Sequence, residues 1–197
     1  AFPVYFNCKG GPMESGDTVP ALLERQVQSS VYWEDTIRRM AADGVDTILT
    51  CDNGIAAEAQ IARAKSLGMT VIVTDHHEVP YEVLEDGSRQ ECLPEADAVI
   101  DPKRKDCGYP FDGICGAVVA YKFLQVLFAG DDTAQTQALL QELLSFAAFA
   151  TVGDVMELVD ENRIIVRYGL QQILRSANPG LQALLSVNGL QDKKLSA

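Results

Sequence analysis

A run of five residues at 70–74 (TVIVT) limits the folds open to this 197-residue chain more than any other feature. The run is almost wholly apolar and β-branched, which is typical of a parallel strand buried on both faces. A second strand is predicted at 46–51 (DTILTC), and residues 56–67 between the two have the character of a helix that Gly68 ends. Strand, helix and strand joined by short loops predict a parallel sheet with right-handed crossovers.

The rest of the chain fits around such a sheet. Short strands are predicted at 3–8 and 98–100, and helices at about 18–28 and 30–42. After Cys107 the pattern becomes mainly helical, with predicted helices at 114–128, 135–150, 162–174 and 181–187. The predicted fold class is therefore α/β, with a parallel Rossmann-like sheet, flanking helices and a mostly helical C-terminal half.

Composition argues against several classes of protein. The chain is 47% hydrophobic, which is enough for one core, and it has no apolar run of the ~20 residues that cross a bilayer. Its five cysteines lack CxxC spacing, so we expect free thiols in the cytoplasm and neither a zinc ribbon nor a disulfide scaffold. A net charge of −12 argues mildly against tight nucleic-acid binding by this chain alone, and suits a site that gathers divalent cations.

Polar clusters follow both buried strands at the point where each strand ends. Asp52 and Asn53 follow the first strand, and Asp75, His76 and His77 follow the second. Neighbouring parallel strands meet at one edge of a sheet, and ligands of open α/β folds bind beyond the carboxyl ends. The only two histidines in the chain therefore lie at that edge beside an aspartate, which packing alone explains poorly.

These residue types suit metal-assisted phosphate chemistry. Carboxylates with one imidazole are ligands for Mn²⁺ or Mg²⁺, and two such ions about 3.5–4 Å apart can activate a water against phosphorus. A second histidine can contact the phosphate or the leaving oxygen. The Asn53-Gly54 pair allows a tight turn before a helix N-terminus that can face an anion. Asp154 ends the apolar stretch 147–153 and is a candidate for completing the metal site.

Each of these residues also has a structural interpretation. A strand-end aspartate more often caps a turn or a helix, which would be the interpretation of Asp52 or Asp154 taken alone. A pair of histidines is about as often part of a solvated loop. The functional interpretation is favoured because Asp-His-His directly follows a buried strand and lies beside a second strand that ends in aspartate.

Four ordered segments resemble the DHH phosphoesterase family and, within it, the RecJ-like single-stranded-DNA exonucleases. They are DTILTCDNGI (46–55), SLGMTVIVTDHHEVP (66–80), DPKRKDCGYPFDGICGAVVAYKF (101–123) and ATVGDVMELVDENR (150–163). The resemblance covers about 43–197. It implies a hydrolase of DNA repair and recombination that degrades single-stranded DNA from 5′ to 3′ with two Mn²⁺ or Mg²⁺ ions.

The resemblance also implies roles for individual residues. Asp52, His76 and Asp154 match the metal ligands of the family. His77 matches the histidine that meets the scissile phosphate, and Asp75 would orient the two neighbouring histidines, so these two residues are the predicted catalytic pair.

Two further residues are predicted to lie beside the substrate. They are Asn53, in the turn after the first strand, and Gly116, in a glycine-containing stretch that the family places near the active site. Where the family has a second glycine this chain has Val118, which would narrow the local groove.

The resemblance is incomplete in one motif and in length. The family has an Asp-x-Asp at the end of an early strand, which supplies ligands for both metals, and no such pair precedes Asp52 here. The chain also stops before the DHH-associated and OB domains of the family. The resemblance therefore implies one bound metal or fewer, and little or no activity of this chain.

The first 48 residues resemble a different family. The segments AFPVYFNCKGG (1–11) and LLERQVQSSVYWEDTIRRMAADGVDTI (22–48) are similar to the C-terminal part of malonyl-CoA:acyl-carrier-protein transacylases, but the serine and histidine of that family do not accompany them. The predicted organisation is a transacylase-like segment at 1–45 joined to a partial DHH domain at 46–197. A non-catalytic metal- or phosphate-binding module and, less favoured, a surface that contacts acyl-carrier protein are the alternatives to a nuclease.

Overall fold

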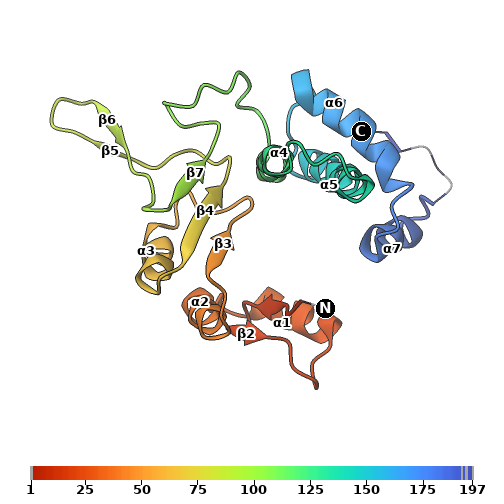
Figure 1. Ribbon diagram of the computed structural model, residues 1–197, viewed down its shortest axis with the longest axis horizontal. Coiled ribbons are helices and arrows are strands. Elements are labelled where there is room, and N and C mark those ends of the chain that lie inside the picture. Colours follow the sequence, from red (N-terminus) through yellow and green to blue (C-terminus); the bar gives the residue numbers. More distant parts are fainter. Residues whose placement is uncertain (1, 192, 194, 197) are drawn as a thin grey trace.

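The predicted strand at 70–74 is the central strand of a parallel sheet. The computed structural model describes residues 2–191, 193, 195 and 196. In it, β4 (Thr70–Thr74) pairs with β3 (Thr47–Leu49) on one side and with β7 (Ala98–Ile100) on the other. Because all three strands run parallel, their carboxyl ends meet at one edge of the sheet (Figure 1). This confirms the α/β fold class.

Helices cover both faces of this sheet. On one face, α2 (Trp33–Ala42) and α3 (Glu58–Ser66) enclose a core cluster that includes Val73 of β4. On the other face, α4 (Gly116–Leu127) contributes to a second core cluster, against which Ile100 of β7 packs. Figure 1 shows α3 and α4 on opposite sides of the strands. Burial on both faces explains why β4 contains no charged residue.

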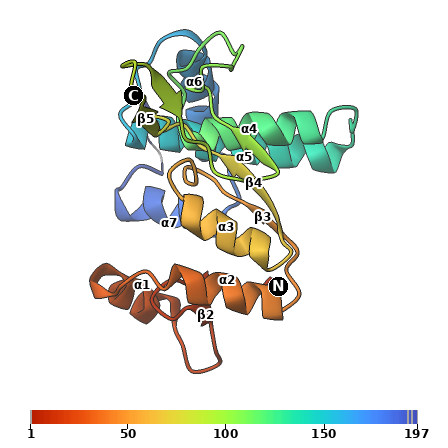
Figure 2. The same ribbon diagram turned by 90° about the vertical axis from the view of Figure 1, so that its left-hand side faces the viewer.

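The N-terminal segment forms a short hairpin followed by two helices. The predicted strand is reduced to β1 (Tyr5–Phe6), which pairs with β2 (Gly11–Pro12) in antiparallel fashion. Helix α1 (Val19–Gln28) begins where predicted, because the Thr18 hydroxyl accepts a hydrogen bond from the Ala21 amide at 3.4 Å. Figures 1 and 2 show α1 and α2 at the opposite end of the molecule from α4 and α5.

The chain forms an antiparallel hairpin between β4 and β7 in the sequence, and this hairpin was not predicted. It consists of β5 (Tyr81–Val83) and β6 (Arg89–Glu91), joined by a turn in which Gly87 adopts a φ of 81°. Its side chains are mostly exposed and polar, so its sequence lacks the apolar alternation by which a half-buried strand is recognised.

The C-terminal half is helical, as predicted. It contains α5 (Ala134–Gly153), α6 (Asp160–Ile173) and α7 (Pro179–Val187). A Cβ at Gly169 would lie 2.3 Å from the Cβ of Ala148, so the glycine is what allows α5 and α6 to pack so closely. Within the part of the chain that the structure describes, no helix is long and apolar enough to cross a membrane.

We expect Val73→Ala to lower the free energy of unfolding by about 2 kcal/mol, because it removes two methyl groups from a fully buried position. Val83→Ala is the matched control: it changes a strand valine that is 65% exposed, and should alter stability by about 0.5 kcal/mol or less. Urea denaturation followed by circular dichroism measures both. Equal effects of the two substitutions would contradict the assignment of β4 as the core strand.

Candidate metal centre

The loop after β3 folds back over the tip of β4. The Asp52 amide donates to the Thr74 carbonyl at 3.1 Å, and Asn53 forms an isolated bridge with Thr74. The loop needs two left-handed residues, Asp52 at a φ of 60° and Gly54 at 123°. A Cβ on Gly54 would lie 2.9 Å from Cγ1 of Val73, so only glycine lets the loop pass this close to the strand. Asp52 is thereby held beside the end of β4.

The carboxylate of Asp75 is buried, with 1% of the residue exposed, and fully hydrogen-bonded. Its Oδ2 accepts from the Ile55 amide at 2.9 Å, and its Oδ1 accepts from the His76 amide at 2.8 Å. Oδ1 also lies 2.6 Å from Nδ1 of His77. Burial alone would raise the pKa of Asp75, but the hydrogen bonds from Ile55, His77 and His76 hold that pKa below its usual value.

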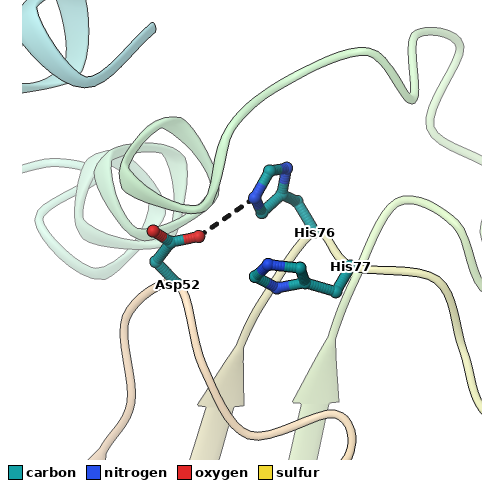
Figure 3. Close-up of side chains that lie close together, drawn as sticks. All are labelled: Asp52, His76 and His77. Carbon is teal, nitrogen blue, oxygen red and sulfur yellow. Dashed lines mark ion pairs between the residues drawn. The ribbon is translucent and has the colours of Figure 1, made fainter. Parts of the chain in front are cut away.

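His76 is the point at which three elements meet. Its Nε2 lies 3.0 Å from Oδ1 of Asp52 and 3.4 Å from Oδ2 of Asp154 (Figure 3 shows the contact with Asp52). Asp154 reaches this position because α5 continues to Gly153, three residues beyond its predicted end, and Asp154 caps it. His76 itself is only 7% exposed, while both carboxylates remain about half exposed. The centre is thus anchored on a buried imidazole and open on its acidic side.

His77 lies beside His76 but in a different environment. The two ring centroids are 4.6 Å apart with a tilt of 56°, and the His77 side chain is 60% exposed. The hydrogen bond to Asp75 raises the pKa of His77, and the negative charges of Asp52 and Asp154 raise it further. Asp52, His76 and His77 each contribute one potential ligand atom, and these three atoms lie within 4.8 Å of one another (Figure 3).

Gly116 packs directly against Asp52. A Cβ at Gly116 would lie 2.5 Å from the Asp52 Cα and 2.6 Å from its Oδ1. The first residue of α4 must therefore be glycine for Asp52 to occupy its place. Gly116 was predicted to lie beside the substrate. In the structure it packs against Asp52, the predicted metal ligand, which is a different role. Asn53 lies in the same loop with its side chain exposed.

The structure brings the predicted metal and catalytic residues to one edge of the sheet, and it adds one buried residue that was not among the predicted site residues. Asp101 follows β7 directly and is 2% exposed. Its Oδ1 accepts from the Lys103 amide at 2.9 Å, and its Oδ2 is buried without a hydrogen-bond partner in the described part of the chain. An aspartate directly after a third predicted strand was the signal that could have identified it.

The donor set fits a hard divalent cation. Two half-exposed carboxylates and an imidazole nitrogen converge, and none of the ligand atoms is a thiolate. Mn²⁺ and Mg²⁺ prefer such oxygen and nitrogen ligands to sulfur. Asp52, His76 and Asp154, which converge at Nε2 of His76, are the residues that would hold such a cation.

Comparisons with known proteins place the chain in one family. A family model described as "DHH family, N-terminal domain" matches residues 10–151, and the chain belongs to this family. It is 36% identical over 156 residues to the single-stranded-DNA-specific exonuclease RecJ of Bacillus subtilis, a match that covers 79% of this chain and 18% of that protein. The RecJ of Escherichia coli is 36% identical over 171 residues, covering 83% of this chain and 28% of that protein.

Solved structures agree with this assignment. The crystal structure of RecJ in complex with Mn²⁺ from Thermus thermophilus superposes with a TM-score of 0.60 and 27% identity, over 79% of this chain and 21% of that one. A second structure, exonuclease RecJ bound to manganese, superposes with a TM-score of 0.59 and 27% identity, over 79% of this chain and 37% of that one. The chain thus spans between about a fifth and two-fifths of these proteins. The family match starts at residue 10 and takes in α1 and α2, for which the transacylase resemblance stays a prediction.

We expect Asp75→Asn to lower the pKa of His77, because it removes the negative charge that favours the imidazolium. In the wild type this pKa lies above its ordinary value of 6.5, so the associated stability is fully present below pH 6.5 and is lost as the pH rises through the raised pKa. An NMR titration of the metal-free protein, which contains only two histidines, measures the change. Asp86→Asn is a control on the exposed hairpin turn; an unchanged His77 pKa in Asp75→Asn would contradict the contact.

Gly116→Ala should lower the free energy of unfolding by about 1–3 kcal/mol, because the new methyl overlaps the backbone of Asp52. This exceeds the ~0.5–1 kcal/mol that alanine gains over glycine in a helix. Gly108→Ala is the control, since a Cβ there meets nothing within 4 Å. Chemical denaturation in the presence of a chelator measures both. Stabilisation by Gly116→Ala would show that the loop with Asp52 lies elsewhere.

Proposed function

We propose that this chain is the metal- and phosphate-facing part of a phosphodiesterase that degrades single-stranded DNA from 5′ to 3′, and that its site is incomplete as the chain stands. The observation that carries this proposal is the convergence of the Asp52 and Asp154 carboxylates on Nε2 of His76. The exonuclease activity that the RecJ relatives' names state gives the substrate class. The Mn²⁺ in the two similar structures supports Mn²⁺ or Mg²⁺ as the cofactor.

Three side chains would hold the cation. Asp52 and Asp154 offer half-exposed carboxylates, and His76 offers a buried nitrogen. When bound, such a cation supplies Lewis-acid stabilisation and lowers the pKa of a coordinated water. The role of the protein is to keep the three ligands in place, which it does through the β3 loop, the tip of β4 and the end of α5.

His77 would act on the phosphate. Its Nδ1 is held by Asp75 at 2.6 Å, so the remaining ring nitrogen is free to meet a phosphate or leaving oxygen. Asp75 favours the imidazolium form, which can donate a proton to that oxygen. Asp75 and His77 therefore form the proposed catalytic pair. Asn53 and Gly116, in the loop and helix end that surround Asp52, are the proposed substrate-side residues.

The proposed incompleteness concerns the second cation. Within the described residues, β3 is an outer strand of the sheet and pairs only with β4. No Asp-x-Asp precedes Asp52 in this chain, although the family resemblance places one there. We therefore expect one weakly bound cation and little or no hydrolysis by this chain.

A non-catalytic metal-binding module is the second candidate. The net charge of −12 favours it, because a negative charge disfavours tight binding of nucleic acid. An acyl-carrier-protein contact surface is the third, and it has only the N-terminal resemblance in its favour. We further propose a cytoplasmic location, which the free state of Cys8, Cys51, Cys92, Cys107 and Cys115 supports.

Calorimetric titration with Mn²⁺ tests the proposed site. We expect one weak site in the wild type and a loss of at least ~10-fold in affinity in Asp52→Asn, because a ligand charge is removed. Asp132→Asn, an exposed aspartate on the turn before α5, is the matched control and should bind as the wild type does. Wild-type protein without any Mn²⁺ binding would contradict the proposal.

A nuclease assay on 5′-labelled single-stranded DNA distinguishes the first two candidates. Weak Mn²⁺-dependent cleavage that His77→Ala removes favours the incomplete enzyme, and binding without cleavage favours the module. Two tight Mn²⁺ sites with robust cleavage would show that the site is complete and that the expected inactivity is wrong.

A further inference from the structure

We propose that the exposed face of α6 is a docking surface for single-stranded DNA, on which arginines bind phosphates and Tyr168 stacks on a base. The choice of partner rests on the proposed function, but the surface lies outside the metal centre and uses none of its ligands. The distribution of charge, a hollow beside the helix and the exposed tyrosine ring support this proposal.

The segment that contains most of α6 and all of α7 carries only positive charge. None of the 28 acidic residues falls between Asn162 and Gln191, although the chain has a net charge of −12. The same segment contains Arg163, Arg167 and Arg175, and none of these arginines forms an ion pair with another described residue. Complementarity to a polyanion is therefore local to this part of the chain, and the negative total conceals it.

Helix α6 has one side in the core and the other in solvent. Its buried residues are Asn162, Ile165, Val166, Gly169 and Ile173. On the exposed side, Arg163, Arg167 and Gln171 follow one another at spacings of four and form a row with steps of about 6 Å along the helix axis. Ile164 and Tyr168 form a second exposed row beside the first. The two rows make one continuous polar and aromatic face.

A hollow lies along the first row. A cavity of about 560 Å³ is lined by Arg163, Arg167 and Gln171, and Leu170 and Leu174 add apolar walls. Guanidinium groups bind phosphate oxygens through pairs of parallel hydrogen bonds. Two guanidinium groups in one hollow also repel each other, and an anion between them offsets that repulsion. The hollow therefore suits a phosphate group with less polar atoms attached to it.

The ring of Tyr168 distinguishes a nucleic acid from an anionic membrane. Tyr168 is 52% exposed, and the guanidinium carbon of Arg167 lies 5.8 Å from the centre of its ring. Aromatic rings beside cationic side chains hold single strands through base stacking, independently of sequence. A helix that binds a bilayer inserts its apolar face, but the apolar face of α6 is packed against α5, where Ile165 shares a core cluster with Ala148. A single strand is therefore the favoured occupant.

The docking surface begins close to the metal centre. Leu158 also lines the hollow, and it follows the proposed ligand Asp154 by four residues. Four residues span at most about 14 Å, so this end of the hollow lies within that distance of Asp154. Figures 1 and 2 show α6 beside α5, whose C-terminal end carries Asp154. A strand with one end at the cation can therefore continue over α6.

Fluorescence anisotropy of a fluorescein-labelled oligothymidine, in a chelator so that cations play no part, tests the surface. We expect weak binding at low salt, with a slope of log affinity against log salt of about −2, because three phosphate contacts contribute about 0.7 each. Arg163→Gln/Arg167→Gln should reduce the slope to about −0.7. Tyr168→Ala should weaken binding at least ~5-fold. Arg25→Gln/Arg38→Gln is the matched control, because it removes the same charge from exposed arginines of α1 and α2 and should bind as the wild type does.

Two results with oligothymidine overturn the proposal. One is the absence of binding by the wild type at low salt, and the other is an equal loss of affinity in the two double variants, which would be an effect of net charge. Sedimentation with phosphatidylserine vesicles tests the membrane: retention on vesicles without binding of oligothymidine overturns the proposal as well.

Mn²⁺ calorimetry separates this proposal from the proposed function. Oligothymidine binding that depends on Arg163 and Arg167, in a protein that binds no Mn²⁺, supports the docking surface and contradicts the proposed function. Mn²⁺ binding without oligothymidine binding contradicts the docking surface and leaves the proposed cation site intact.

Discussion

The site depends on one buried carboxylate, that of Asp75. An ionised group with 1% exposure is tolerated only when hydrogen bonds replace its lost water. Here the donors come from the loop after β3, through the Ile55 amide, and from the segment after β4, through the His76 amide and the His77 ring. Asp75 therefore adds a second link between the two strand tips, beside the hydrogen bond from the Asp52 amide to the Thr74 carbonyl, and the two together hold Asp52 in place.

The two adjacent histidines beside this carboxylate lie in different environments. His77 shares a short contact with Asp75 and remains mostly exposed, so its environment favours a charged ring open to solvent. His76 is buried and directs Nε2 at Asp52 and Asp154. Two adjacent histidines thus differ in exposure and in the charges that surround their rings. If the proposed function holds, identical mutations at the two positions should have different effects on metal binding and on catalysis.

Local pattern was sufficient for the sheet and for half of the site. The limits of β4 and β7 follow from β-branched runs, and the strand-tip positions of Asp52 and His76 follow from parallel order. The rest depends on distances that no local pattern contains. Asp154 meets His76 only because α5 runs on to the end of the apolar stretch. The need for glycine at Gly116 arises from its close approach to Asp52, which is far from it in the sequence.

The balance of charge at the sheet edge favours a cation. The carboxylates of Asp52, Asp75, Asp101 and Asp154 lie around two imidazoles, in a chain whose net charge is already −12. Asp75 has its hydrogen bonds, but Asp52 and Asp154 both lie at Nε2 of His76, and a positive charge between these two carboxylates would offset their mutual repulsion. A divalent ion offsets this repulsion in the folded state only, so its binding and folding must be linked. A site with fewer ligands gains less from the ion, so the incomplete ligand set that we propose should weaken both metal affinity and the stability of this edge.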